Sequence, residues 1–400
     1  MKIIITGASG YIGRQIVPLF LDNNHQLLLI GRDTTRLNEL FPGIEATSYA
    51  KLDALEGNYD AFVHLAVMNN DQIGSLQDFR DANVNLLDQI VSVAKHANVS
   101  TIINLTTLHV TSDANGSYYA QTKAEAEELL SKQKEFNIVN IRLPAVYGAT
   151  YKGKLAILNK VPNFMRDFCL QFLGALKPTV HINKVYSAII ENLSSDTSNE
   201  AIVTDGQSEN RVYHFFNRTM DIGFCLCTIL FLSWLLVIVW IAIKINSDGP
   251  SFFRQERVGK HGNAFTCWKF RTMRVNTPQA GTHEIGQSAI TPIGAFLRRT
   301  KVDELPQIWN ILKNELSLVG PRPCLPVQKE LVAERQKLGV LDIKGGITGL
   351  AQIRGIDMSN PVKLAKIDHE YVQLRTVLLD LKIIIATATG KGRGDNVKEK

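Results

Sequence analysis

The sequence has little cysteine, and what it has is not arranged for a metal site. Five cysteines in 400 residues show no ligand spacing, and two of them lie inside a long apolar run. The pattern supports neither a zinc centre nor a disulfide framework, and we expect a reducing compartment. The five are Cys169, Cys225, Cys227, Cys267 and Cys324.

Internal repeats, long low-complexity tracts and recognisable nucleic-acid modules are also absent. The chain opens directly on an apolar segment, MKIIITG, so we expect no cleavable signal peptide. The tail from Gly390 is polar, and we expect it to be loose. The length allows two or three domains, and we expect no nucleic-acid partner.

Charge is divided unevenly along the chain. Residues 1–210 carry 17 Lys+Arg against 22 Asp+Glu, a balance of −5, whereas residues 211–400 carry 27 against 16, a balance of +11. The basic half is also the half that contains the apolar run. This combination fits an anionic membrane surface and phosphate-rich substrates.

The apolar run extends from Ile222 to Ile243 without a charged residue or a proline. Asp221 closes it on one side and Lys244 on the other. As a helix it would be roughly 33 Å long, enough to cross the core of a bilayer. The alternative is a buried core helix, because nothing on this segment is polar enough to face water.

A glycine loop follows the first predicted strand, Lys2–Thr6, and precedes an amphipathic helix. Gly7 allows the tight turn, Gly10 lets the backbone approach a pyrophosphate, and Gly13 lets the helix pack on the sheet. The helix N-terminus would then face the phosphates. The residues expected to bind a dinucleotide here are Gly7, Gly10, Tyr11, Ile12 and Gly13.

The second predicted strand, Gln26–Ile30, ends in Gly31, Arg32 and Asp33. An NAD site usually has an acidic residue at the strand end, where it holds the ribose hydroxyls. Gly31 takes that place, and the guanidinium of Arg32 suits a 2′-phosphate. We therefore expect NADP rather than NAD, the alternative being that Arg32 is a solvated loop residue.

Thr107, Tyr119 and Lys123 form a candidate catalytic set. Tyr119 and Lys123 are four residues apart, so they share one helix face. The ammonium can lower the pKa of the phenol, and Thr107 can polarise a substrate oxygen. Lys123 can also hold a ribose. The alternative is a surface helix on which this spacing has arisen by chance.

Residues 1–207 resemble an extended short-chain dehydrogenase/reductase of the nucleotide-sugar epimerase/dehydratase type. The resemblance implies a nicotinamide cofactor and a nucleotide-sugar substrate, and it adds His64 and Ala66 to the cofactor residues. Two departures are Thr106–Thr107 in place of the commoner serine pair, and a short segment after Gly148 where the family has its substrate lobe. The matching segments are GASGYIG (7–13), HLA (64–66), NVN (83–85), the Thr107/Tyr119/Lys123 set, RLPAVYG (142–148) and HINKV (181–185).

The second half gathers cations around one acidic pair, Asp303 and Glu304. Lysine and arginine recur in the segments WKFRTM (268–273), FLRRTK (296–301) and GPRP (320–323). One carboxylate could attack phosphorus while the other holds a divalent ion, and the cations would neutralise a pyrophosphate. The alternative is an ordinary helix start in a DELPQ turn.

From about Phe216 to Lys391 the chain resembles the bacterial sugar transferases, the monotopic phosphoglycosyl transferases. Motifs that match in order include GGITGLAQ (345–352), DHEY (368–371) and LDLK (379–382). The resemblance implies that Asp303 is a nucleophile forming a covalent phosphosugar intermediate, with Glu304 beside it at a magnesium ion held by the pair. It places four cations at substrate phosphates: Lys269, Arg271, Arg298 and Arg322.

We therefore predict an α/β protein made of two domains. A Rossmann-type, doubly wound parallel sheet occupies 1–207, a linker 208–215, a mostly helical membrane-associated domain 216–391, and a loose tail 392–400. The polar stretch Ser194–Arg211 is expected to hold the last short strand of the first domain.

The two resemblances together predict a bifunctional enzyme. The first domain would reduce a UDP-4-keto-sugar, for example a 4-keto-6-deoxy-N-acetylhexosamine. The second would transfer the sugar 1-phosphate to polyprenyl (undecaprenyl) phosphate, which starts a polysaccharide or glycoconjugate repeat unit. Two alternatives stay open: an epimerase with bound NAD, and an inactive nucleotide-sensing scaffold. The sugar and the oligomeric state stay open as well.

Both domains would use cytoplasmic molecules, and the sequence has no second apolar segment of spanning length. We therefore expect the 222–243 segment to enter and leave by the cytoplasmic face of the bacterial inner membrane, in contact with its lipids. Membrane helices of the transferase family usually break at a Ser-Pro pair, but here Ser233 precedes Trp234. We expect the bend near Ser233, with its hydroxyl bonded to a backbone carbonyl one turn back.

Overall fold

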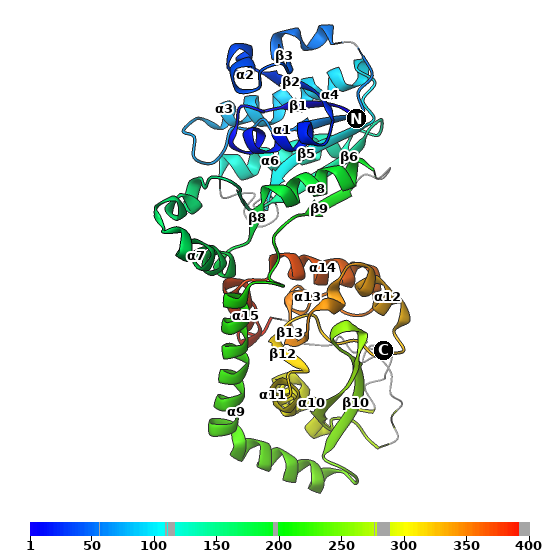
Figure 1. Cartoon of the computed structure of the whole chain (residues 1–400). Helices are drawn as coiled ribbons and strands as arrows, with labels where there is room; N and C mark the ends of the chain where they lie inside the picture. Colours follow the sequence, from blue (N-terminus) through cyan, green and yellow to red (C-terminus); the bar gives the residue numbers. More distant parts are fainter. Residues whose placement is uncertain are drawn as a thin grey trace. The chain divides into compact units, whose positions relative to one another are not determined.

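The computed structural model divides into two compact units, which are described separately below (Figure 1). The first contains Met1–Leu170 and Pro178–Asp205, and the second contains Gln171–Lys177 and Gly206–Lys400. The structure describes every residue except 56, 109, 111–116, 195–198, 276, 278–288 and 392–400. The predicted loose tail, 392–400, lies outside the described residues.

The first unit is built on a parallel sheet of seven strands in the order β3-β2-β1-β4-β5-β6-β9. From β1 the chain builds outward to β3 on one side, then returns to add β4, β5, β6 and β9 on the other. This reversal makes the sheet doubly wound, as predicted. The strands are β1 (Lys2–Thr6), β2 (Gln26–Gly31), β3 (Glu45–Ser48), β4 (Ala61–His64), β5 (Thr101–Thr107), β6 (Asn137–Leu143) and β9 (Asn199–Ile202).

Helices cover both faces of the sheet, which is why its strands are apolar on both sides. In β1, Ile3 and Ile5 face one core and Ile4 faces the other. The remaining elements between residues 1 and 205 are α1 (Tyr11–Asp22), α2 (Thr34–Leu40), η1 (Tyr49–Ala54), α3 (Leu76–Arg80), the π-helical turn η2 (Asp81–Asn85), α4 (Leu86–His96), α6 (Tyr118–Ser131), β7 (Ala145–Tyr147), η3 (Gly153–Lys160), α7 (Asn163–Leu176), β8 (Thr179–His181) and α8 (Ile182–Leu193).

The second unit is mostly helical, with one antiparallel hairpin and one short parallel pair, β12 with β13. Its chain begins with a 36-residue helix and returns through a globular body. The elements are α9 (Arg211–Asn246), β10 (Phe252–Val258), η4 (Lys260–Gly262), β11 (Ala264–Phe270), α10 (Pro292–Thr300), η7 (Val302–Gln307), α11 (Ile308–Leu312), β12 (Leu316–Val319), α12 (Lys329–Lys337), η8 (Val340–Asp342), β13 (Gly345–Thr348), α13 (Leu350–Ile353), α14 (Pro361–Leu374) and α15 (Val377–Ala388).

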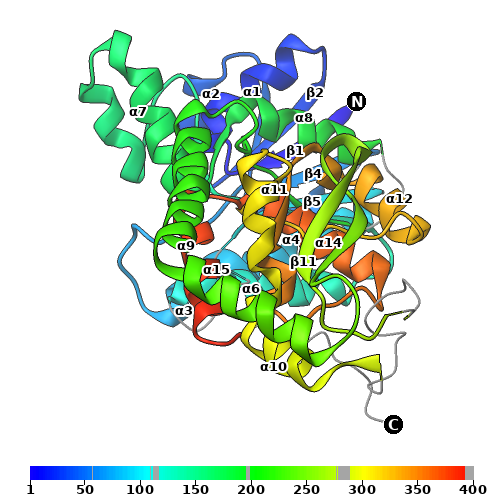
Figure 2. The same cartoon turned by 90° about the horizontal axis from the view of Figure 1, so that it is seen from below.

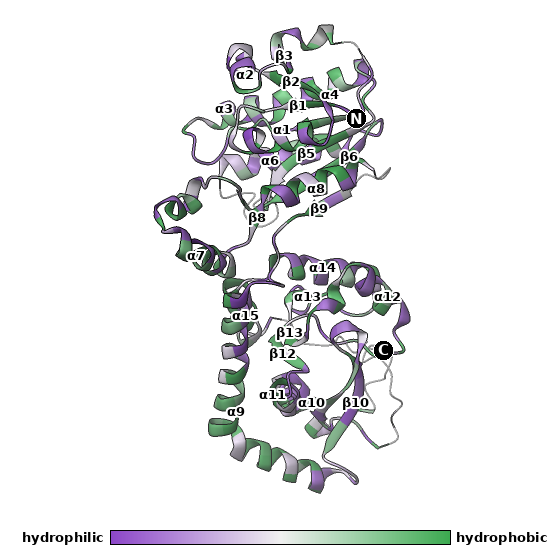
Figure 3. Ribbon diagram, viewed as in Figure 1, coloured by the Kyte–Doolittle hydropathy of each residue, from purple (hydrophilic) through white to green (hydrophobic). Residues whose placement is uncertain are grey.

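Helix α9 is longer than the apolar run and is not straight. The Asn210 side chain caps its first turn by accepting from the Tyr213 N–H, so residues 211–215, which we had assigned to a linker, are helical. Figures 1 and 2 both show two arms of α9 meeting at a bend, and Figure 3 colours both arms as hydrophobic. Only 17% of the most apolar stretch is buried. The alternative of a buried core helix is therefore excluded.

The two arms pack against the same globular body. Cys225 on the first arm lies in a cluster with Ile311 of α11, whereas Val239 and Ile243 on the second arm pack with Phe270 of β11. No residue from 229 to 238 is buried. The segment between the two contacts is thus an apolar tip that projects from the second unit.

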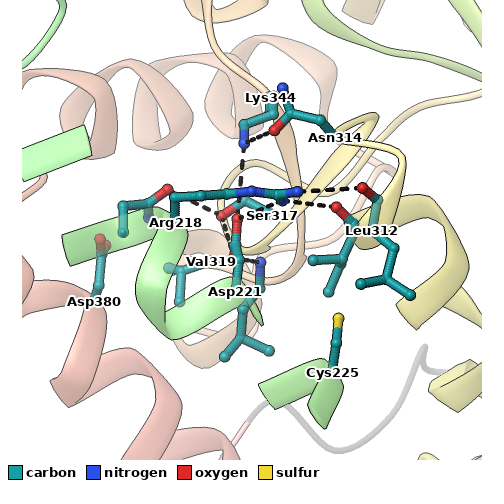
Figure 4. A network of polar contacts seen from close by, with 12 residues as sticks. Arg218, Asp221, Cys225, Leu312, Asn314, Ser317, Val319, Lys344 and Asp380 are labelled. Carbon is teal, nitrogen blue, oxygen red and sulfur yellow. Dashed lines mark hydrogen bonds and ion pairs between the residues drawn. The ribbon is translucent and has the colours of Figure 1, made fainter. Parts of the chain in front are cut away.

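Polar contacts fix the first arm at the point where the apolar run begins (Figure 4). Asp221 is fully buried and accepts hydrogen bonds from the Ser317 hydroxyl at 2.9 Å and the Leu318 N–H at 2.7 Å. The Arg218 guanidinium donates to the carbonyls of Ile311 and Leu312, the last residues of α11. Helix α9 is therefore bonded to α11 and β12, and these bonds fix its position along its own axis relative to both elements.

The backbone hydrogen bond that we expect from Ser233 is made by the tryptophan that follows it. The Trp234 indole N–H donates to the Phe231 carbonyl at 2.8 Å. Ser233 is exposed, and its hydroxyl makes no hydrogen bond with the described part of the chain. The expected serine bond is therefore wrong, because the indole of the next residue reaches a carbonyl in the preceding turn instead.

The packing of both arms on one body predicts that the ends of α9 lie on one side of a membrane. Cysteines introduced as Arg211→Cys and Asp248→Cys, in a chain whose Cys169 and Cys227 are replaced by serine, report the side of each end. In intact cells we expect an impermeant maleimide to label both only after permeabilisation. Labelling from opposite sides would mean that α9 crosses the bilayer.

Candidate active sites

The glycine loop after β1 has the geometry that close backbone approach requires. Gly7 has φ +72°, and a Cβ there would lie 2.5 Å from the Ala66 nitrogen. A Cβ on Gly13 would lie 2.5 Å from Ala8 Cα, so only glycine lets α1 pack this closely. Tyr11 and Ile12 begin α1, and no side chain caps its N-terminus. Free N–H groups at that end can bind an anion.

The end of β2 presents a cation and no free acid. Arg32 is exposed, directly after the strand. The Asp33 carboxylate caps α2 by accepting from the Arg36 N–H at 3.0 Å. The Asp33 carboxylate is therefore already engaged as a helix cap. The Arg32 guanidinium is the charged group at the strand end that remains available to bind a ligand.

His64 ends β4 with its ring inside the protein. The ring is fully buried and hydrogen-bonded through Nδ1 to the Thr6 hydroxyl at 2.9 Å. Burial, and then the charge of Lys123, lower the pKa of His64 to about 3, so the imidazole is neutral. The ring braces the ends of β1 and β4, whereas the backbone of Ala66 lies against the glycine loop.

The structure brings Thr107, Tyr119 and Lys123 together. A hydrogen bond joins the Tyr119 and Thr107 side chains, and the Lys123 ammonium donates to the Leu105 carbonyl at 2.9 Å. Burial raises the pKa of Tyr119, and the bond to Thr107 lowers it by less. Our expectation of a lowered phenol pKa is therefore wrong, because burial destabilises the phenolate by more than the hydrogen bond to Thr107 stabilises it. Burial also lowers the pKa of Lys123 to about 8.

A buried asparagine holds this region together. Asn83, in the π-helical turn η2, accepts from the Met68 N–H at 2.8 Å and donates to the Thr122 hydroxyl at 3.0 Å. It thus connects the loop after β4 to the helix that carries Tyr119 and Lys123. The sequence showed Asn83 only within the NVN segment, and nothing in that segment indicated the contacts.

The second site lies in the second unit, where η7 packs against β11. Asp303 and Glu304 are both buried in the first turn of η7. Glu304 Oε1 accepts from the Lys269 ammonium at 2.7 Å and from the Arg322 guanidinium at 2.8 Å. Its Oε2 is buried and has no hydrogen-bond partner among the described residues. A buried carboxylate oxygen that lacks a hydrogen-bond partner is a suitable ligand for a cation.

The two carboxyl groups differ in acidity. Burial, and then the neighbouring charge of Glu304, raise the pKa of Asp303 to about 6. Burial would raise the pKa of Glu304 as well, but Arg322 and Lys269 outweigh it and hold that pKa well below its usual range. Glu304 is therefore ionised and engaged, while Asp303 makes no hydrogen bond to the described part of the chain and can act on a ligand.

The other two predicted cations have different surroundings. Arg298 donates to the Thr272 hydroxyl at 3.2 Å, and its charge is among those that lower the pKa of Asp303. Arg271 is buried and donates to the carbonyl and hydroxyl of Ser247, at the end of α9. The structure thus groups Lys269, Arg298 and Arg322 around the dyad and uses Arg271 to hold the second arm of α9.

A buried ion pair supports Arg322 from behind. Arg335 donates to the Asp368 carboxylate at 2.6 and 3.0 Å, and to the Arg322 carbonyl at 2.9 Å. Both side chains of the pair are almost completely buried. Sequence reasoning missed Arg335, because the segment AERQK reads as an exposed helix. The segment DHEY did contain Asp368, but without an indicated partner.

Comparison with known proteins divides the chain close to residue 206, where the second compact unit resumes. Residues 3–206 match the model of the NAD dependent epimerase/dehydratase family, and residues 212–391 match that of the bacterial sugar transferases. The first half is also similar to a solved UDP-N-acetylglucosamine 4-epimerase from Bacillus cereus, with a TM-score of 0.41 and 19% identity over 56% of this chain and 84% of that one.

Curated relatives cover the second half. The uncharacterized sugar transferase EpsL of Bacillus subtilis is 40% identical over 172 residues, which are 43% of this chain and 83% of the relative. The UDP-glucose:undecaprenyl-phosphate glucose-1-phosphate transferase of Escherichia coli is 35% identical over 185 residues, 44% of this chain but only 40% of the relative. The chain therefore belongs to two families, the NAD-dependent epimerases/dehydratases through its first half and the bacterial sugar transferases through its second.

Proposed function

We propose that the chain is a bifunctional enzyme that prepares a UDP-sugar and loads it onto a lipid carrier. The first half reduces a UDP-4-keto-sugar. The second transfers the sugar 1-phosphate to polyprenyl (undecaprenyl) phosphate at the cytoplasmic face of the bacterial inner membrane. The observation that carries the proposal is the dyad of η7. The buried carboxyl group of Asp303 has no hydrogen bond to any residue that the structure describes, and it lies beside Glu304, a carboxylate that two cations hold ionised.

The dyad supports transfer in two steps. The Asp303 carboxylate attacks the phosphorus bonded to the sugar, and the bond to the other phosphate breaks, so that UMP leaves with the electron pair. An oxygen of polyprenyl phosphate then attacks the same phosphorus and releases Asp303. Lys269, Arg298 and Arg322 would neutralise the phosphate charges. The name of the Escherichia coli relative, a UDP-glucose:undecaprenyl-phosphate transferase, supports this choice of substrates.

Asp303 and Glu304 are also the residues that would hold a magnesium ion. The unpartnered Oε2 of Glu304 fits this role. Among the described residues no cluster of three or more His, Cys, Asp or Glu side chains could complete a cage, so substrate phosphate and water would supply the remaining ligands. When bound, the ion would offset negative charge on the diphosphate.

The first site supports reduction of a carbonyl. The raised pKa keeps the Tyr119 phenol protonated at neutral pH, so it can give its proton to the oxygen of the reduced carbonyl, while Thr107 holds that oxygen. Lys123 can bind the ribose of the cofactor, and the cofactor supplies the hydride when bound. The exposed Arg32 at the end of β2 favours NADP.

Two other functions of the first half would share these residues. An epimerase would keep its NAD bound and return the hydride to the same sugar, and the family description includes epimerases. An inactive, nucleotide-sensing scaffold would need no catalytic set. The bond between Tyr119 and Thr107 favours catalysis over the scaffold.

Helix α9 supports membrane attachment from one side. Its two arms pack on one body, and the segment from 229 to 238 between them has no buried residue. We infer a re-entrant helix whose tip dips into the bilayer, with Lys244 at its exit near the headgroups. Both active sites would then share the compartment that contains nicotinamide cofactors and UDP-sugars.

If Asp303 is the nucleophile, Asp303→Asn lowers UMP release by at least about 10³-fold, because an amide cannot attack phosphorus. Wild-type protein given a UDP-sugar alone acquires a phosphosugar adduct on the peptide containing Asp303, detectable by mass spectrometry. The exposed acid Asp342 offers a matched control, and Asp342→Asn retains both signals. Normal turnover in Asp303→Asn would contradict the assignment.

The acidity of Asp303 predicts how the first step depends on pH. UMP release in a single turnover without acceptor falls as pH drops through about 6, since the carboxylate must be ionised to attack. Lys269 lowers the pKa of Asp303, so Lys269→Met moves this fall to higher pH, whereas Lys269→Arg leaves it in place. An unchanged pH profile of UMP release in Lys269→Met would contradict this explanation of the acidity of Asp303.

The reductase is tested by Tyr119→Phe, which we expect to stop NADPH oxidation with a UDP-4-keto-sugar and to leave transfer of a ready-made UDP-sugar unchanged. Tyr118→Phe, at the exposed neighbouring tyrosine, retains both activities. In binding assays Arg32→Ala weakens NADPH much more than NADH. An equal loss for both cofactors removes the case for NADP, and oxidation that survives in Tyr119→Phe removes Tyr119 as the acid.

A further inference from the structure

Helix α7 carries an apolar face that the described residues leave uncovered. Phe164 is 85% exposed and Phe168 60%, and Met165 and Phe172 are exposed beside them. At 100° per residue these four side chains fall within an arc of about 100° on one side of the helix. Scattered exposed apolar residues need no explanation, but three phenylalanines at four-residue spacing form a continuous stripe.

The stripe is held in place at one end. The last turns of α7 pack on the start of α9, where Ala175 shares a cluster with Tyr213. The rings of Phe172 and Phe216 meet edge to face, with centroids 6.4 Å apart. The Asn210 side chain donates to the Gln171 carbonyl at 2.9 Å. The stripe is therefore presented by an anchored helix.

The apolar surface continues from α7 onto the outer face of α9. Phe215, next to Phe216, is 69% exposed. Leu226 and Leu230 lie 11 and 15 residues further along, positions that the helical period places on the same face as Phe215, and both are exposed. The stripe of α7 thus adjoins the surface of the helix that we propose enters the bilayer.

Exposed basic residues flank α7 in the sequence on both sides. Lys154 and Lys160 precede α7, and Lys177 and Arg211 follow it, all of them exposed. The helix itself has one acid, Asp167. An apolar face with flanking basic residues is typical of a helix lying in the interface of an anionic membrane. A symmetric dimer through the same face would instead bring like charges together.

We propose that α7 is a second membrane contact, an interfacial helix next to the start of α9 whose phenylalanine stripe inserts among anionic lipids. The proposal rests on the membrane attachment proposed above. Residues 163–170 of α7 belong to the first unit. The contact would therefore bind that unit to the bilayer directly, and the chain connection through α9 would not be its only link to the membrane.

Photo-crosslinking of the full chain tests this contact. p-Benzoylphenylalanine replaces Phe164, and in separate proteins Phe168, Phe231 at the tip of α9, or the fully exposed Ile73. Each protein is reconstituted in phosphatidylcholine vesicles with and without phosphatidylglycerol, irradiated and analysed by mass spectrometry. We expect lipid adducts at Phe164, Phe168 and Phe231, several-fold above those at Ile73, with the α7 adducts increased by phosphatidylglycerol.

The outcomes separate the two proposals. Lipid adducts at Phe231 but only the Ile73 level at Phe164 and Phe168 would overturn the role of α7 and leave membrane attachment intact. Background at Phe231 as well would remove the attachment itself. A protein–protein adduct of twice the chain mass at Phe164 would identify a second copy as the occupant and overturn the lipid contact. In Lys154→Glu/Lys160→Glu, loss of the phosphatidylglycerol effect would support the role of these flanking basic residues.

Discussion

The structure of the second unit depends on the attachment of both ends of the apolar helix α9 to the same folded body. Because both ends are fixed to that body, the middle of the helix is the part that can leave water for an apolar environment. The first arm of α9 is bonded through Arg218 and Asp221, and the second packs through Val239 and Ile243. The contacts fix both arms, while no residue of the tip is buried and only Leu235 and Leu236, at its second-arm side, pack partly against the body. Because α11 follows η7 directly in the chain, the same bonds relate α9 to the Asp303–Glu304 pair.

The dyad shows how one set of cations can give two adjacent carboxyl groups opposite properties. Lys269 and Arg322 both bond to Glu304 Oε1, so most of their effect falls on one residue. At Asp303, burial and the negative charge of Glu304 raise the pKa by more than the nearby cations lower it. A carboxylate that is poorly stabilised in the free protein loses little when it bonds to phosphorus, which suits a transient covalent role.

The sequence predicted the fold class because it depends on local patterns such as glycine spacing and strand ends, and the residues that we propose for both sites come from the same kind of pattern. It could not predict contacts between distant segments. Arg335 with Asp368, and Asp221 with Ser317, meet only through tertiary packing. The serine bond at the bend and the lowered pKa of Tyr119 were wrong for a related reason, because each was inferred from a neighbour in sequence and decided by the reach or burial of side chains in space.

The second unit includes a piece of chain from within the first family region. Gly174 accepts from the Gln207 amide at 2.7 Å, and Ala175 packs with Tyr213 and Val377. A recombination point between the two matched regions, near residue 207, would separate these partners and expose Tyr213, one of the largest fully buried side chains. The two halves are consequently not interchangeable modules: any exchange of the first half in evolution has to bring a compatible 171–177 segment with it.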